Sequence, residues 1–404
     1  MIELLYDPDV GTSLAIAKAD AGPAILASIE LPNGEVLIPY GATNNLLTSG
    51  CIALPSAIGR YESQAALVAE ITAFLHRYVD LSPAFEELAA YYVLFSWVYD
   101  AFNEAPILRL RGELGSGKSR ALLAIGLLCH KSFFASGAST VSPVFHIINA
   151  FQGVMALDEA DFRFSDSTAD LVKILNNGTM RGLPVLRTLT NRHRELSPSA
   201  FCVFGPKIIA MREHFADEAL ESRCITEEMG ARPLRSGIPL VTPATLRVEA
   251  QALRNDLLAW RFAARHTVAI DPSCMLETLS PRGNQMAIPL LSLIEDAAAR
   301  ERVGVYLANA DLRARARRAS QPHIAIAGIL DRLFREDGTT HVSVSKLARE
   351  YSSSTGNALA IKSVGHMVRS QLRLETRKSA GIYVIPAYEK SKVAELMARF
   401  GEIN

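Results

Sequence analysis

The stretch that most constrains the fold lies between residues 107 and 130 and reads ILRLRGELGSGKSRALLAIGLLCH. The apolar run at 107–110 predicts a buried strand, and the Ala- and Leu-rich run after Lys118 predicts a helix. Between them, residues 112–119 match the phosphate-binding pattern G-x-x-x-x-G-K-[ST], in the strand–loop–helix setting that this pattern requires. We call residues 112–119 the P-loop. They predict an α/β fold that binds a nucleotide at the end of a strand.

The residues of the P-loop have separate predicted roles. Glycines let consecutive backbone N–H groups curl around phosphate oxygens, and the following helix adds its positive N-terminal end. Lys118 is predicted to reach the β- and γ-phosphates, and Ser119 to ligate Mg²⁺. The predicted cofactors are therefore ATP and Mg²⁺, and the predicted nucleotide-binding residues are Gly112, Gly115, Ser116, Gly117, Lys118 and Ser119.

A second acidic feature follows about forty residues later, at GVMALDEAD (153–161). A buried apolar strand that ends in Asp-Glu is the Walker B arrangement. It would bring Asp158 beside the phosphates to hold Mg²⁺ through water, and Glu159 to polarise the attacking water. A surface-facing acidic strand end is the alternative. A predicted strand at 133–135 and a predicted helix up to residue 150 separate the two motifs, and this spacing favours Walker B. Asp161 is predicted to cap a helix or to lie in a loop.

Composition restricts the class of protein. A chain of 404 residues is too long for one compact core, so we expect two to four domains. The five cysteines are scattered without C-x-x-C pairing, which predicts buried thiols in a cytoplasmic protein. Charge breaks every apolar run well short of a membrane span, and no secretory segment opens the chain, so no membrane partner is expected. The formal net charge is zero, so any nucleic-acid binding must come from local basic patches.

Two segments precede the P-loop. Residues 1–60 are predicted to be β-rich, with a hairpin in which residues 24–30 and 35–40 flank Asn33-Gly34. Residues 62–102 are predicted to form two helices, and the second carries a dense group of aromatic residues. Aromatic side chains can stack on bases, but at helical spacing among Leu and Val they are predicted to belong to the core.

A basic segment follows Walker B. Two β-prone runs, 182–190 and 199–204, flank Arg192, His193 and Arg194, which predicts a hairpin with a basic tip. In a ring-shaped translocase such a tip would meet the backbone phosphates of nucleic acid. A solvated loop is an equally weighted alternative.

A buried strand is predicted at residues 207–211, and the run LESRC ends at residue 224. In a ring ATPase, Arg223 of this run would be a candidate arginine finger that enters the site of a neighbouring subunit.

The order of P-loop, Walker B, hairpin, strand and LESRC resembles the AAA+ ATPases. Ser222-Arg223-Cys224 resembles the Ser-Arg-Cys motif of clamp-loader subunits, in which the arginine acts in trans. The hairpin resembles that of the MCM (minichromosome maintenance) helicases. The runs FGPK (204–207), SPRGNQ (280–285) and PLL (289–291) resemble helicase domains that plasmids and integrated mobile elements use for self-replication. The resemblance covers residues 90–300, about half of the chain.

The resemblance implies a ring of subunits, with a hexamer as the expected state. Lys118, Asp158 and Glu159 would be catalytic in one subunit, and Arg223 would act from the next. Arg282 corresponds to a sensor 2 arginine that contacts the nucleotide, with an exposed helix-start arginine as the alternative. Where these ATPases usually carry Asn or Thr after the strand between Walker B and the finger, this chain reads AMRE (210–213), so its sensor 1 departs from the pattern.

Residues 239–320 are predicted to be a helical lid, with one helix at 246–262 and another one or two at 286–307, the first of them a lid helix at 286–300. The C-terminal part has the order helix (324–334), strand (341–344), helix (345–351), turn, helix (361–374) and β-wing (378–385), and it resembles a winged helix. Lys and Arg outnumber Asp and Glu by 12 to 8 in residues 321–404. The third helix and the wing carry the predicted DNA-binding residues Lys362, Arg369, Arg373, Arg377 and Lys378. A protein-contact module is the alternative.

Together these features predict five parts: a β-rich domain (1–60), a helical segment (61–105), an AAA+ core (106–238), a helical lid (239–320) and a winged-helix DNA-binding domain (321–404). The predicted function is an ATP-dependent DNA translocase or helicase in the replication of a mobile element. Single-stranded DNA would lie in the channel and duplex DNA at the winged helix, with a primase or other replication protein as a partner. The alternatives are an ATP-switched initiator, loader or regulator, and a protein-remodelling or defence ATPase.

Overall fold

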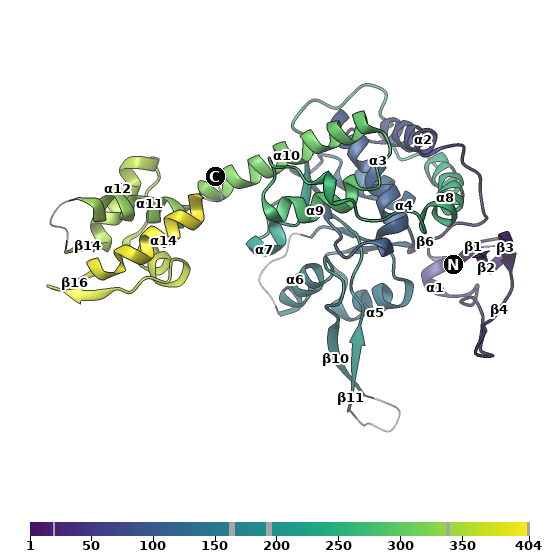
Figure 1. Cartoon of the computed structure of the whole chain (residues 1–404), viewed down its shortest axis with the longest axis horizontal. Helices are drawn as coiled ribbons and strands as arrows, with labels where there is room; N and C mark the ends of the chain where they lie inside the picture. Colours follow the sequence, from purple (N-terminus) through teal and green to yellow (C-terminus); the bar gives the residue numbers. More distant parts are fainter. Residues whose placement is uncertain (19–20, 161–165, 191–195, 337–339, 402–404) are drawn as a thin grey trace. The chain divides into compact units, whose positions relative to one another are not determined.

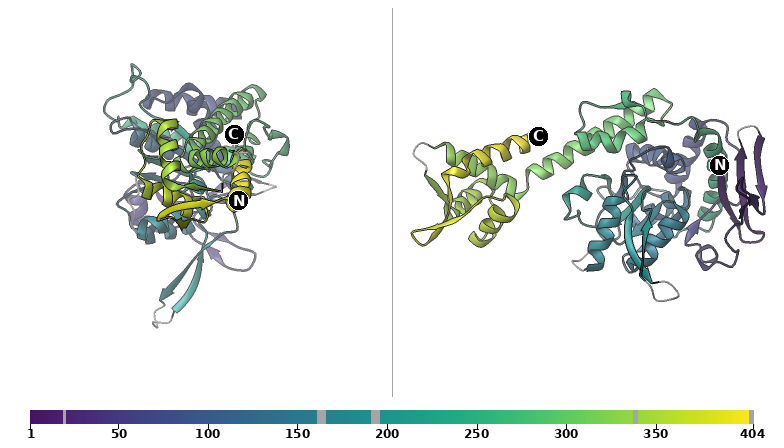
Figure 2. Two further views of the ribbon diagram at one scale, coloured as in Figure 1. Left: turned by 90° about the vertical axis from the view of Figure 1, so that its left-hand side faces the viewer. Right: turned by 60° about the horizontal axis from the view of Figure 1, so that its bottom comes forward.

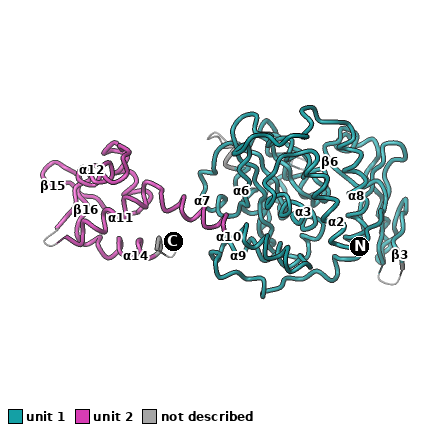
Figure 3. The backbone as a smooth tube through the Cα atoms, turned by 90° about the horizontal axis from the view of Figure 1, so that it is seen from above, with its two compact units in different colours: residues 1–308 teal, residues 309–404 magenta. Residues whose placement is uncertain are grey.

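The computed structural model describes residues 1–18, 21–160, 166–190, 196–336 and 340–401. The chain divides into two compact units, Met1–Ala308 (unit 1) and Asn309–Asn404 (unit 2), shown in Figure 3. The finer division into five parts stays a prediction. Among the described residues, no helix combines the length and the apolar character that crossing a membrane requires.

A six-stranded sheet forms the centre of unit 1 (Figure 1). Its strands, in the order β13-β7-β12-β9-β8-β6, are parallel except for β6, which pairs antiparallel with β8 at one edge. The strands that we predicted on both sides of the P-loop and Walker B motifs are all in this sheet, which confirms an α/β fold with a parallel sheet. The bounds are β6 (Ile52–Ala53), β7 (Ile107–Arg111), β8 (Ser132–Ser136), β9 (Met155–Asp158), β12 (Lys207–Met211) and β13 (Cys224–Glu228).

Helices cover both faces of this sheet. Successive side chains of a strand point to opposite faces, so the apolar side chains of each strand are buried under helices on both sides. Leu108 and Ile208 join one buried apolar cluster, while Ile107 and Ile209 join the other. The first cluster includes side chains of α2 (Gln64–Tyr78), α3 (Pro83–Val98), α4 (Lys118–Leu128) and α8 (Thr245–Ala264). The second includes side chains of α5 (Val141–Phe151) and α6 (Asp166–Asn177).

The aromatic side chains of α3 belong to the core, as predicted. Tyr92 is fully buried and its hydroxyl donates to the carbonyl oxygens of Pro106 and Lys207, each at 2.9 Å. Trp97 is also buried, and its Nε1 donates to the carbonyl oxygen of Leu128 at 2.9 Å. Polar atoms of buried aromatic residues need such partners, so these rings anchor the helix rather than forming a base-stacking surface.

The N-terminal strands form an antiparallel sheet in the order β1-β2-β3, with bounds Ile2–Asp7, Gly11–Lys18 and Ala21–Leu26. The predicted turn at Asn33-Gly34 is present, but the hairpin is shorter than expected: β4 (Ile29–Glu30) and β5 (Val36–Leu37) have two residues each. The prediction of a strand at 24–30 was wrong because residues 24–26 pair with β2 instead. A short helix, α1 (Asn45–Thr48), precedes β6.

Glu3 of β1 connects this sheet to the rest of unit 1. Its buried carboxylate contacts Arg261 Nε of α8 at 2.7 Å, Lys131 Nζ at 2.7 Å and His130 Nε2 at 3.1 Å. Burial by itself raises the pKa of Glu3, but the charges of Lys131 and Arg261 and the hydrogen bond from His130 together hold that pKa well below its ordinary value. Arg261 also donates to both carboxylate oxygens of Asp100 at 3.0 Å.

The region predicted as a lid has two helices after α8, α9 (Pro281–Leu291) and α10 (Ala297–Ala319). Of the one or two helices predicted at 286–307, two are present, so the prediction of a single lid helix from 286 to 300 was wrong. Leu293 and Ile294 are both buried, and Asp296 caps a new helix, because its Oδ1 accepts from the backbone N–H of Ala298 at 2.8 Å and of Ala299 at 3.1 Å. The short helix α7 (Glu218–Glu221) lies between β12 and β13 in sequence.

The predicted hairpin consists of β10 (Val185–Thr190) and β11 (Leu196–Phe201), which pair antiparallel. Figures 1 and 2 show it projecting from the body of unit 1. Its base is fixed to neighbouring helices, because Arg187 Nη2 donates to Asp170 Oδ2 at 2.8 Å and the rings of Phe145 and Phe201 lie 4.7 Å apart. These contacts hold the base of the hairpin against α5 and α6.

Unit 2 has its own apolar core, to which four helices contribute, and a three-stranded sheet in the order β14-β16-β15. Its elements also include a helix, α14, that the sequence did not predict. The bounds are α11 (Pro322–Arg335), β14 (His341–Ser343), α12 (Val344–Thr355), α13 (Ile361–His366), β15 (Arg377–Ser379), β16 (Ile382–Pro386) and α14 (Lys390–Gly401).

The prediction of a third helix at 361–374 was wrong at its C-terminal end. The α-helix α13 ends at His366 and passes into a π-helical segment, Met367–Gln371. Leu372 and Leu374 are both buried. Arg373, which lies between them, has a φ of +53°, a left-handed conformation that an α-helix cannot contain, so the helix ends before this residue.

Candidate functional site

The P-loop joins β7 to α4 as the sequence predicted. Gly115 and Gly117 have φ of +78° and +89°, which residues with a Cβ rarely adopt, and Gly117 is the N-cap of α4. Gly112 N donates to the carbonyl oxygen of Met211, so the loop starts across the end of the neighbouring strand β12. The exposed hydroxyl residue Ser119 lies in the first turn of α4.

Lys118 curls back over the P-loop. Its Nζ donates to the carbonyl oxygens of Gly112 at 2.7 Å and Glu113 at 2.6 Å, and to Ser116 Oγ at 3.3 Å. The ammonium group therefore lies on the concave side of the loop, at the N-terminus of α4, where an anionic phosphate would gain from both the charge and the helix dipole.

The segment after β13 closes one side of the P-loop, which no sequence motif indicated. Met229 N donates to the carbonyl oxygen of Arg111 at 2.6 Å. A Cβ atom on Gly112 would lie 2.4 Å from the Met229 carbonyl oxygen, and one on Gly230 would lie 2.8 Å from Ser116 Cβ. Only glycine fits at residue 112 without moving this backbone.

Asp158 and Glu159 lie at the same edge of the sheet as the P-loop. Strand β12 pairs in parallel with both β7 and β9, so the carboxyl ends of all three strands meet at one edge. Two strand spacings, about 9–10 Å, separate β9 from β7. Asp158 Oδ1 accepts from Glu159 N at 2.9 Å, and Glu159 is exposed with φ of +55°. Asp161 lies outside the described residues.

These residues fit a magnesium–nucleotide complex. A carboxylate and a hydroxyl are the hard oxygen ligands that Mg²⁺ prefers, and such sites use few protein ligands together with phosphates and water. In the described part of the chain, no group of three or more His, Cys, Asp or Glu side chains could hold a metal ion by itself. The fit therefore depends on phosphate oxygens between Ser119 and Asp158.

The end of β12 lies between the two motifs. Met211 is buried, while Arg212 and Glu213 are exposed. Where the resemblance implies an uncharged polar sensor 1 residue, this chain therefore has two charged residues, Arg212 and Glu213, at this edge of the sheet.

Arg223 lies at the opposite end of the sheet from the P-loop. Its carbonyl oxygen accepts from the N–H of Ile107, the first residue of β7, at 3.0 Å. The five residues of β7 separate it from the P-loop by about 16 Å along the strand. Arg223 Nη1 donates to Asn176 Oδ1 at 3.2 Å.

Arg282 belongs with Arg223 rather than with Lys118. Burial lowers the pKa of Arg223, and the nearby charge of Arg282 lowers it further. Arg282 Nη1 donates to Gln285 Oε1 at 2.5 Å in the first turns of α9. Gln285 Nε2 in turn donates to Glu104 Oε1 at 3.4 Å, just before β7 begins, so Arg282 lies near the N-terminal end of that strand, away from the P-loop of the same chain.

The predicted DNA-contacting residues fall into two groups. Arg192, His193 and Arg194 lie outside the described residues, between β10 and β11. In unit 2, the five predicted residues are all exposed, and two of them lie against one ring: the Cζ atom of Arg369 and the Nζ atom of Lys378 are each 5.8 Å from the centroid of Tyr383. The five are Lys362, Arg369, Arg373, Arg377 and Lys378.

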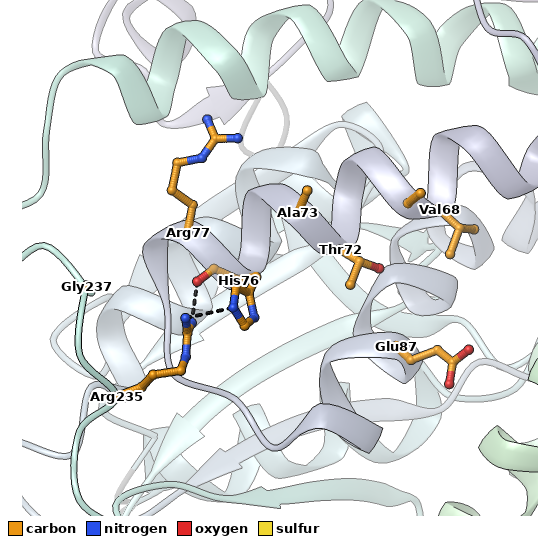
Figure 4. Close-up of a pocket in the computed structure, with 9 residues that line it drawn as sticks. Val68, Thr72, Ala73, His76, Arg77, Glu87, Arg235 and Gly237 are labelled. Carbon is orange, nitrogen blue, oxygen red and sulfur yellow. Dashed lines mark hydrogen bonds between the residues drawn. The ribbon is translucent and has the colours of Figure 1, made fainter.

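A cavity of about 630 Å³ lies beside α2 and the segment that follows β13. Figure 4 shows Arg235 reaching over to His76, whose ring Nε2 lies 2.8 Å from Arg235 Nη1. None of the predicted site residues lines this cavity.

No family model matches the chain, and no curated protein matches it. Among solved structures, an apo structure of the NrS-1 C-terminal region aligns over 95% of this chain and 96% of that chain, at 12% identity and a TM-score of 0.37. An active helicase, SCCmec type IV Cch, aligns over 98% and 94%, at 11% identity and a TM-score of 0.34. An inhibitor-bound JCV helicase aligns over 61% of each chain, at 14% identity and a TM-score of 0.28. The case for a function therefore rests on the residues of the site.

Proposed function

We propose that this chain is an AAA+ ATPase that assembles into a ring and couples ATP hydrolysis to movement along DNA. One observation carries the proposal. Lys118 and Ser119 share one edge of the parallel sheet with Asp158 and Glu159, while Arg223 lies at the opposite end of the P-loop strand. Under this proposal, one face of the chain carries the phosphate-binding, metal-binding and water-activating residues, and a different face carries the arginine that would complete the site of a neighbouring copy.

Each residue of the site has a role that its chemistry suits. Lys118 would bind phosphate oxygens, and Ser119 and Asp158 would hold Mg²⁺. Glu159 would accept the proton of a water molecule. Bound MgATP would supply the phosphoryl group and the cation that offsets its charge.

Arg223 and Arg282 would act on the nucleotide of a second copy. Both lie near the N-terminal end of β7, away from the P-loop of their own chain, so under this proposal neither completes that site from within. Two adjacent guanidinium groups repel each other, and a phosphate group at an interface would relieve that repulsion. Arg282 would then serve as a sensor 2 residue in trans. A hexamer is the proposed state.

Unit 2 would be the winged helix that binds duplex DNA. The succession of α11, β14, α12, α13 and the β15–β16 hairpin supports this proposal, as does the exposure of its five basic residues. The hairpin tip with Arg192, His193 and Arg194 would contact single-stranded DNA in the channel. Replication of a mobile element, with a primase as a partner, is the proposed setting.

The test compares the ATPase rate of the full chain with and without single-stranded and forked DNA. Wild type is compared with Lys118→Ala and Arg223→Ala, and with Arg302→Ala as a control for loss of an exposed arginine in the same unit. DNA should stimulate wild type and the control. Both site variants should lose turnover, Arg223→Ala by roughly a thousandfold.

Other outcomes would contradict parts of the proposal. If Arg223→Ala hydrolyses ATP at the wild-type rate, sites shared between copies are excluded. Turnover that no DNA changes would replace the translocase with a protein-remodelling ATPase. The double variant Arg192→Ala/Arg194→Ala should lose unwinding but keep ATP binding, whereas a loader would tolerate the change.

A further inference from the structure

Arg109 is a charged residue in the middle of the strand that leads into the P-loop, and it is 2% exposed. Its guanidinium donates to both carboxylate oxygens of Glu221, at 2.5 Å and 2.6 Å, and its Nε donates to Thr226 Oγ1 at 3.0 Å. Glu221 is buried as well. A bidentate pair of this kind fixes the orientation of both side chains, because two parallel hydrogen bonds define a plane.

Glu221 organises the backbone around it. It is the last residue of α7, and its Oε2 also accepts from the backbone N–H of Phe215 at 3.0 Å. Its Oε1 lies 2.9 Å from His214 Nδ1. One carboxylate thus ties together both ends of the turn between β12 and β13, and Arg223 follows Glu221 by two residues.

We infer that the Arg109–Glu221 pair positions Arg223, because it fixes the turn that carries Arg223 to the strand that carries the P-loop. The inference rests on the proposed function, in which Arg223 reaches the nucleotide of a second copy. Arg109 and Glu221 are positioning residues, since both are buried and act on Arg223 only through the turn that they hold. A misplacement of about 1 Å at a reacting group can cost about a hundredfold in rate, so a pair that fixes the turn carrying Arg223 has a direct effect on turnover.

The first experiment measures ATPase kinetics of the full chain with Glu221→Gln, which keeps the shape and removes the charge. The expected result is a fall in kcat of at least about tenfold, while the KM for ATP and the Kd of a fluorescent ATP analogue change by less than about threefold. Arg109→Lys keeps the charge but cannot form the two-nitrogen fork, so it should shift kcat in the same direction.

The matched control is Glu3→Gln. Glu3 and Arg261 form a similarly buried carboxylate–guanidinium pair in the same unit, with side chains 4% and 6% exposed. Its loss should lower the melting temperature and leave kcat within about twofold of wild type. A fall in kcat for this control equal to that of Glu221→Gln would mean that loss of stability alone explains both, and would overturn the inference.

The second experiment mixes variants in equal amounts. Lys118→Ala subunits carry an intact Arg223, and Glu221→Gln subunits carry an intact P-loop, so the mixture should be more active than the two variants measured separately. Arg223→Ala mixed with Lys118→Ala tests the shared site itself, and failure of that mixture contradicts the proposed function.

The mixture of Arg223→Ala with Lys118→Ala serves as the reference. If this reference mixture regains activity, two results would contradict the positioning inference alone: a wild-type kcat for Glu221→Gln, or no gain in activity when Glu221→Gln is mixed with Lys118→Ala. If Glu221→Gln does not fold, Arg109→Lys replaces it in the same mixture and is judged by the same outcomes.

Discussion

The carboxylate of Glu3 provides a quantitative test of how the N-terminal sheet is attached. Replacing it by Gln in Glu3→Gln removes the negative charge that Arg261, Lys131 and His130 share in a buried site. Removing one partner of a buried ion pair typically costs about 3–5 kcal/mol. We expect a loss near 3 kcal/mol, because Arg261 keeps both hydrogen bonds to Asp100.

This loss converts into a shift of the melting temperature. An unfolding entropy of about 2.1 cal/mol/K per residue gives about 0.65 kcal/mol/K for the unit Met1–Ala308, so a loss of 3 kcal/mol lowers Tm by about 5 °C. Differential scanning calorimetry of the full chain can resolve such a shift.

The control for this test is Glu87→Gln, which breaks the exposed ion pair with Arg302. Exposed pairs contribute about 0–1 kcal/mol, so its Tm should fall by no more than about 1.5 °C. If the Tm of Glu3→Gln falls no further than that of Glu87→Gln, the reasoning that Glu3 is a buried tether is refuted.

Three further predictions follow from single residues. Burial lowers the pKa of His130 from 6.5 to about 4, so between these pH values the unfolded chain binds more protons than the folded one. The free energy of unfolding should therefore fall by about 3 kcal/mol as the pH drops from 6.5 to 4. A series of Tm measurements against pH should show this fall in wild type and a smaller one in His130→Gln. Lys207→Met should cost about 3 kcal/mol in urea unfolding, because three backbone carbonyl oxygens lose the buried ammonium that donates to them, and an unchanged midpoint would contradict this. Gly112→Ala should weaken binding of a fluorescent ATP analogue at least tenfold, since its Cβ would lie 2.4 Å from the Met229 carbonyl oxygen, whereas Gly41→Ala, with open space around it, should bind normally.

Much of unit 1 follows from local sequence patterns. The predicted helix at 246–262 corresponds to α8 (Thr245–Ala264), and the strand before the P-loop corresponds to β7. These elements were predictable because their apolar periodicity is long or their loop chemistry is specific. The roles of Lys118 and Asp158 stay predictions, although both residues reach one edge of the sheet.

Contacts between distant residues were not predictable. Arg109 signalled a buried partner by its presence in an apolar strand, but nothing local identified Glu221, which is more than a hundred residues away. Lys207 begins a strand and reads as a surface residue, yet it is 1% exposed because backbone carbonyl oxygens receive its ammonium group. The end of the third helix was not predictable either, because Arg373 adopts a left-handed backbone conformation that its residue type does not favour.

The separation of Arg223 from the P-loop along β7 has a consequence for assembly. If each copy offers an arginine on one face and a nucleotide site on another, the contact between copies is heterologous, and a two-fold symmetric dimer cannot satisfy it. A pair of copies then holds one complete site and leaves one site and one arginine at its ends. Turnover per chain should rise with protein concentration until the assembly closes on itself, and a terminal subunit of any open chain would bind ATP without hydrolysing it.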